Sequence, residues 1–105
     1  MFGFISGKSL RNDAGAMIVA FAQTCPPPAK LGNKPIPENK VRESLDALYQ
    51  TVGAYTREHR LGILGRARMA KALQEEMRRH EYPDDLVSRM VNAVTVNALV
   101  APTRR

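Results

Sequence analysis

The chain has 105 residues, of which 44% are hydrophobic and 25% charged, and its formal net charge at pH 7 is +6. A chain of this length forms one hydrophobic core, and its ordinary composition excludes the disordered, collagen-like and disulfide-rich classes of protein. The positive charge favours a nucleic acid, an anionic lipid or an acidic protein as partner. We therefore predict one domain over residues 1–105.

The first part of the chain combines features of a secretory signal with those of an amphipathic helix. Lys8 and Arg11 precede an apolar run over residues 14–22, whose Ala-Phe-Ala ending resembles a signal-peptide cleavage site. Asn12 and Asp13 interrupt the join between the basic and the apolar part. We therefore favour an uncut helix. No apolar stretch approaches the roughly 20 residues needed to span a bilayer.

Residues 10–25 form the first predicted helix. Its apolar side chains recur at the three- and four-residue spacing that lines one helical face. They are Leu10, Ala14, Met17, Ile18, Phe21 and Cys25. Ser9 is the predicted N-cap, because its hydroxyl can accept from a free backbone N–H. Three prolines at 26–28 lack N–H donors and favour extended backbone, so we expect the helix to stop there and a proline-rich linker to cover residues 26–36.

The second predicted helix spans residues 38–61 and has the clearest pattern in the chain. Its stripe alternates four- and three-residue steps through Val41, Leu45, Leu48, Val52, Tyr55 and His59. Such a heptad stripe suits packing against a nearly parallel or antiparallel helix. At the end of the helix, we expect Gly62 to adopt the left-handed conformation and Ile63 to cover the cap.

The third predicted helix spans residues 64–80. Its apolar side contains Ile63, Ala70, Leu73 and Met77. Its other side contains Arg68, Lys71, Glu75, Arg78 and Arg79. Gly62 and Gly65 leave two forms open for the junction with the second helix: a tight corner, or one bent rod if Gly65 is tolerated inside a helix at a cost of about 1 kcal/mol. We favour the corner.

The fourth predicted helix spans residues 83–100 and is unusually apolar. Pro83 and the two aspartates after it give a strong start signal, because proline suits the first position and carboxylates suit the positive end of the helix dipole. Between residues 86 and 100 the only charged residue is Arg89. A helix this apolar must be covered on most sides. The four helices together predict an all-α, four-helix bundle-like single domain.

The sequence contains no recognisable catalytic or metal site. Cys25 stands alone, and His59 and His80 are far apart, each without a second histidine or cysteine at ligand spacing. Gly62 and Gly65 lack the Lys-Ser/Thr ending of a phosphate-binding loop. We therefore expect no enzyme, no cofactor and no metal. A single cysteine also excludes an internal disulfide, and we expect a cytoplasmic protein.

The apolar fourth helix favours a non-catalytic protein–protein interaction module, such as an adaptor, regulatory subunit or assembly factor. Its three neighbours are themselves amphipathic, so self-association or docking to a partner would help to bury it. The predicted interface contains Leu86, Val87, Met90, Val91, Val94 and Ala98. The alternative is a monomer whose own core buries the fourth helix.

A second hypothesis is a nucleic-acid-binding regulator that uses the basic side of the third helix. Its predicted phosphate contacts are Arg68, Lys71, Arg78 and Arg79. Against this hypothesis, Glu75 lies at helical spacing from these cations and is expected to pair with them, as on an ordinary solvated face. No aromatic side chains for base stacking are interleaved with the basic residues.

Overall fold

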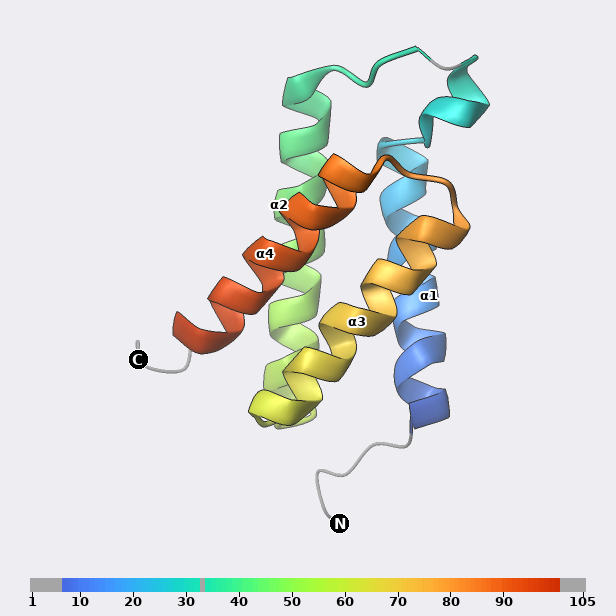
Figure 1. Cartoon of the computed structure of the whole chain (residues 1–105). Helices are drawn as coiled ribbons and strands as arrows, with labels where there is room; N and C mark the ends of the chain where they lie inside the picture. Colours follow the sequence, from blue (N-terminus) through green and yellow to red (C-terminus); the bar gives the residue numbers. More distant parts are fainter. Residues whose placement is uncertain (1–6, 33, 101–105) are drawn as a thin grey trace.

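The computed structural model describes residues 7–32 and 34–100, with side chains for all of these except residues 7, 29, 31 and 96–100. This part of the chain folds into α1 (Gly7–Thr24), a short 3₁₀ helix η1 (Pro28–Leu31), α2 (Glu38–Glu58), α3 (Ile63–Arg79) and α4 (Asp84–Val100). The prediction of an all-α, bundle-like fold with four helices is confirmed (Figure 1). The predicted helix boundaries lie within a few residues of the observed ones.

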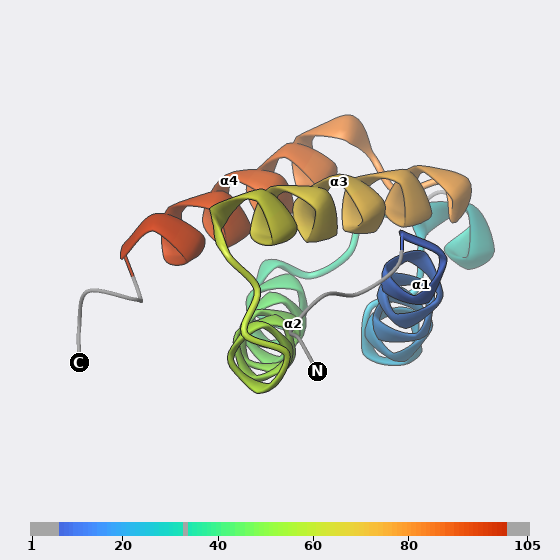
Figure 2. The same cartoon turned by 90° about the horizontal axis from the view of Figure 1, so that it is seen from below.

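The four helices lie in two layers. The hairpin of α3 and α4 crosses over α1 and α2, which are seen nearly end-on in Figure 2. Packing is most extensive between α1 and α3 and between α3 and α4, whereas α2 contacts α1 and α4 over shorter stretches. The molecule is therefore a slab, with extents of 46 × 29 × 19 Å.

The apolar stripes predicted for the first two helices form much of the core between the layers. Every predicted apolar residue of α1, and Cys25 just after it, is at most 8% exposed. The α2 stripe is buried from Val41 to Tyr55, while His59 lies half-buried just beyond the helix with its ring 4.2 Å from that of Tyr55. Buried residues from all four helices belong to one hydrophobic cluster. The three- and four-residue spacing of apolar residues therefore predicts the buried faces of these two helices correctly.

The C-terminal end of α2 differs from the prediction, whereas its start at Glu38 is as predicted. The left-handed residue is Arg60, with φ 54°, and Gly62 has an ordinary φ of −79°. The backbone N–H of Leu61 donates to the Thr56 carbonyl over 2.9 Å, and the Leu61 side chain is 8% exposed. These are the bond and the apolar cover of a Schellman motif. Leu61 therefore covers the cap, and the expectation for Gly62 and Ile63 is wrong because the helix ends two residues earlier.

The junction of α2 and α3 is a corner, as predicted. α2 ends at Glu58 and α3 begins at Ile63, so the two helices are separate elements. A Cβ atom added at Gly65 would lie 3.1 Å from the Cβ of Leu61. Gly65 therefore lets Leu61 approach the backbone of α3 closely.

The apolar side of α3 is only partly as predicted. Ala70, Leu73 and Met77 are buried, together with Met69 and Ala72. Ile63, which the period placed on the same side, is 70% exposed. Ile63 is the first residue of α3, and Leu61, two residues earlier, is the buried apolar residue at this junction.

Two expectations near the N-terminal half also need correction. Ser9 lies inside the first turn of α1 and is not its N-cap. The proline-rich linker is not extended throughout, because Pro28–Leu31 form η1 and Gly32 ends it with φ 70°. Pro27, just before η1, does have the predicted extended backbone, and its side chain is almost fully buried.

Candidate functional site

The predicted interface on α4 lies mainly in the protein's own core. Leu86, Val87, Met90 and Val94 are at most 5% exposed, and Val91 is half-buried against the same cluster. The side chain of Ala98 lies outside the described residues. In the described part of α4, little apolar surface is thus left for a partner beyond Val91. The interface prediction stays a prediction, but the need to cover α4 is met largely within the chain.

Apolar surface does remain in a groove between α3 and α4. The groove has a volume of about 430 Å³ and is open to solvent. It is lined by Ile63, Ala67, Ala70, Val91 and Thr95, with Arg66, Lys71 and Gln74 as its polar members. Ile63 and its neighbour Leu64 are 70% and 69% exposed. We call this set of groove residues together with Leu64 the α3–α4 face.

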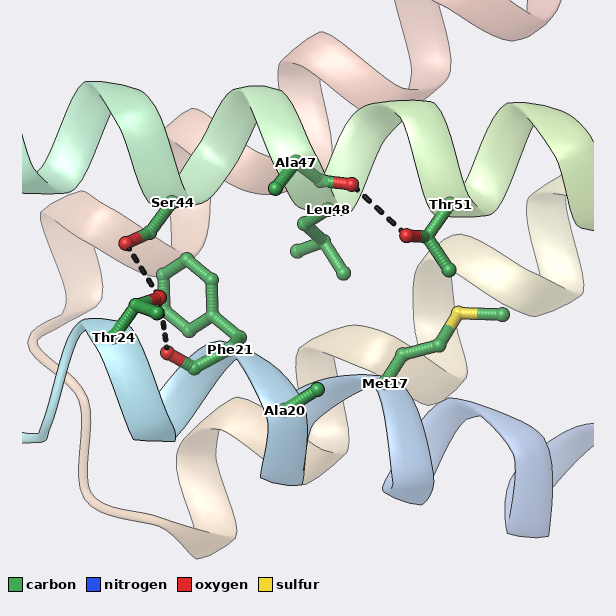
Figure 3. A pocket seen from close by; sticks show the side chains of 8 residues that line it. All are labelled: Met17, Ala20, Phe21, Thr24, Ser44, Ala47, Leu48 and Thr51. Atoms are coloured by element: carbon green, nitrogen blue, oxygen red, sulfur yellow. Dashed lines mark hydrogen bonds between the residues drawn. The ribbon is translucent and has the colours of Figure 1, made fainter.

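A second, smaller groove separates α1 from α2. Figure 3 shows Met17, Phe21 and Leu48 reaching into it, with Ala20 and Ala47 on its two walls. At one end, the Thr24 and Ser44 hydroxyls share a hydrogen bond of 2.8 Å. Its volume of about 140 Å³ is below the roughly 300 Å³ at which small-molecule sites begin. We therefore assign no ligand to it.

A third groove lies between α1 and α3 and is basic. α3 crosses over α1 at an angle, and the two helices run in the same general direction (Figures 1 and 2). Arg11 from α1 and Arg68 and Lys71 from α3 line a hollow of about 360 Å³, together with Leu10, Ala72 and Glu75. We call it the α1–α3 groove. All three cations are exposed.

Two of the four predicted nucleic-acid contacts meet in this groove, and two do not. Arg68 and Lys71 line it, whereas Arg78 lies ten residues beyond Arg68, about 15 Å along the helix at 1.5 Å per residue. Arg79 pairs with Glu76 over 3.4 Å. Arg11 could not be predicted from the sequence, because no local pattern shows that the first half of α1 lies near the middle of α3.

The ion pairs expected for Glu75 are not formed. Among the residues with described side chains, no salt bridge involves Glu75, Lys71 or Arg78. The prediction that Glu75 neutralises the basic side of α3 is therefore wrong. Glu75 is exposed and lines the α1–α3 groove, while the half-buried Glu76 forms the ion pair with Arg79.

The arginine of α4 has a structural partner. Arg89 makes two hydrogen bonds to the carboxylate of Glu38, at 3.1 and 3.0 Å, and so joins α4 to the first turn of α2. The hydrogen bond from Arg89 holds the pKa of Glu38 below its usual value. The pair is exposed to solvent and adds little stability. Its two parallel hydrogen bonds instead orient α4 relative to the start of α2.

The titratable residues considered for chemistry are dispersed. Cys25 is fully buried, and burial raises the pKa of its thiol, which is the opposite of what a nucleophile needs. His59 lies against Tyr55, and His80 caps the end of α3. Within residues 7–32 and 34–100 there is no group of three or more histidine, cysteine, aspartate or glutamate side chains placed to hold a metal ion.

Over the described residues, no helix combines the length and the apolar character needed to cross a bilayer. No family model matches the chain, and neither a curated protein nor a solved structure matches it.

Proposed function

We propose that this protein is a small, non-catalytic interaction module that self-associates through the α3–α4 face. The supporting observation is the pair Ile63 and Leu64, about 70% exposed on a surface that also contains an open groove walled by Ala67 and Val91. Contiguous apolar surface of this kind, beside polar residues, is typical of protein contact sites.

A second copy of the chain is the partner that this face fits. In a two-fold interface, each surface patch contacts its own equivalent, so a protrusion on one copy meets a hollow on the other. The α3–α4 face offers both an exposed apolar side chain and a hollow: Leu64 is 69% exposed at the start of α3, and the preceding residue, Ile63, lines the groove. Two copies related by such an axis can therefore insert Leu64 reciprocally.

The proposal narrows the role predicted for α4. Four of its predicted interface residues belong to the core, so replacing them would unfold the domain before it tested an interface. Val91 and Thr95 are the residues through which α4 contributes to the groove. α3 contributes most of the lining.

Sedimentation over a series of protein concentrations tests this proposal with a matched pair of variants. Ala67→Glu places a charge in the groove, and Ala54→Glu makes the same change at an exposed alanine of α2. We expect the wild type and Ala54→Glu to shift towards a dimer as concentration rises, and Ala67→Glu to remain a monomer. A wild type that is monomeric throughout, or an Ala67→Glu variant that dimerises like the wild type, would contradict the proposal.

A further inference from the structure

We propose that the α1–α3 groove binds the phosphate backbone of a double-stranded nucleic acid. Arg11, Arg68 and Lys71 line one hollow from two helices, and Glu75 is the acidic member of the lining. None of these three cations makes a salt bridge with any residue whose side chain is described. Lys8, one turn before Arg11 on α1, is also exposed.

The chemistry of these groups matches phosphate. A guanidinium presents paired N–H donors that fit phosphate oxygens, and a lysine ammonium adds a point charge. Cations that converge in a concave surface raise the local concentration of an anion more than scattered cations do. Pairing the three cations with phosphates would also supply the counter-charge that Glu75 alone does not provide.

The basic surface extends beyond the size of a single phosphate. Arg78 lies on the same side of α3 as Lys71, so cations follow the helix for about 15 Å from Arg68 to Arg78. Each strand of duplex DNA carries a phosphate about every 3.4 Å of its axis, so a row of cations of this length can contact more than one phosphate. A polymer of phosphates fits the surface better than a mononucleotide does.

Among the described residues, no aromatic side chain lines the groove, which favours a duplex over a single strand. Proteins that bind single strands stack the bases on aromatic rings. The apolar residues that line the α1–α3 groove are Leu10 and Ala72. Binding is thus confined to the backbone, independent of base sequence and strongly dependent on salt.

Anisotropy of a labelled, mixed-sequence duplex DNA tests the inference at several salt concentrations. The test variant combines Arg11→Glu with Arg68→Glu, and the control combines Lys30→Glu with Lys40→Glu, which changes the net charge equally at exposed sites outside the groove. We expect the test variant to lose at least about tenfold in affinity and the control to lose much less. With three phosphate contacts, the slope of log K against log salt should be about −2.7 for the wild type and smaller in magnitude for the test variant.

Three outcomes would overturn the inference. The first is no binding of the duplex at low salt, and the second is an equal loss in both variants, which would show only a general charge effect. The third is binding of vesicles with anionic headgroups without binding of DNA, which would identify a membrane surface as the ligand. Circular dichroism of both variants confirms that the helices remain folded, because all four substituted residues are exposed.

Discussion

At the scale of single residues, Tyr82 shows how the prolines after α1 shape the packing. The carbonyl groups at the end of a helix lack intrahelical donors, and the prolines at 26–28 have no N–H to offer. The Tyr82 hydroxyl donates to the Cys25 carbonyl from the turn between α3 and α4. Its ring meets Phe21 edge-on at 5.4 Å. One side chain thus satisfies the end of α1 and joins it to the opposite layer.

Replacing Tyr82 with phenylalanine tests this role. Tyr82→Phe keeps the ring contact but leaves a buried carbonyl without its donor, so we expect a loss of about 1–2 kcal/mol in the free energy of unfolding. Urea denaturation measures it. Tyr49→Phe is the control, because the half-buried Tyr49 makes no hydrogen bond through its hydroxyl to any described residue, and we expect a change within about 0.5 kcal/mol. Equal effects of the two substitutions would rule out the role of the Cys25 contact.

At the scale of helices, α2 and α3 end in the same way without glycine. Arg60 follows α2 with φ 54°, and Glu81 follows α3 with φ 67°. The next residue, Leu61 or Tyr82, donates its N–H back into the helix and is buried over the cap. A side chain in the left-handed region costs energy that glycine does not incur. The buried apolar residue that follows each helix, Leu61 after α2 and Tyr82 after α3, therefore marks the helix end, and a glycine does not.

Glycine at position 60 should stabilise the protein. Arg60→Gly removes the strain of the left-handed conformation, and we expect a gain of about 0.5–1 kcal/mol in the free energy of unfolding, measured by thermal or urea denaturation. Arg60→Ala retains a Cβ atom at the same φ and should bring no such gain. A destabilised Arg60→Gly variant would mean that the arginine side chain contributes more than its backbone conformation costs.

The sequence predicts the helices well because their signals are local. The stripe from Val41 to Tyr55 is a property of consecutive residues, and all of it is buried. The junctions are predicted less well, since the choice between Arg60 and Gly62 as the left-handed residue depends on where Leu61 finds a place in the core. That Arg11 and Arg68 line the same groove could not be predicted from the sequence, because it depends on how α1 and α3 pack.

At the scale of the whole molecule, two buried tyrosines connect α1 to the rest of the fold. Tyr55 of α2 donates to the carboxylate of Asp13 within α1 over 2.6 Å, and Tyr82 donates to the Cys25 carbonyl just after α1. Burial raises the pKa of both phenols well above the ordinary value of 10.0, and the Asp13 carboxylate raises that of Tyr55 further. Both phenols therefore lose their protons at a higher pH in the folded state than in the unfolded state.

These shifts predict the response to alkaline pH. Below pH 10.0, the ordinary tyrosine pKa, both the folded and the unfolded state bind the phenolic protons, and the tyrosines add no slope. Above it the unfolded state loses them first, so stability falls by up to roughly 1.4 kcal/mol per pH unit for each tyrosine. Urea denaturation from neutral to alkaline pH measures this slope. The double variant Tyr55→Phe with Tyr82→Phe should flatten it, and an unchanged slope would exclude the tyrosines as its source.

The proposed dimer makes a distinct prediction about salt. Each copy carries a net charge of +6, so two copies repel one another while the α3–α4 face attracts through apolar contact. Added salt screens the repulsion between the two copies and leaves their apolar attraction unchanged. The same salt weakens the binding of phosphates to the α1–α3 groove. The two surfaces should therefore respond to salt in opposite directions.

The most direct measurement is the dimer dissociation constant from sedimentation equilibrium at low and at moderate salt, for the wild type and for Leu64→Ser. We expect a wild-type dimer that tightens as salt rises, and a Leu64→Ser protein that remains folded and monomeric under both conditions. A wild type that is monomeric in both salts, or a dimer that Leu64→Ser leaves intact, would contradict self-association through the α3–α4 face.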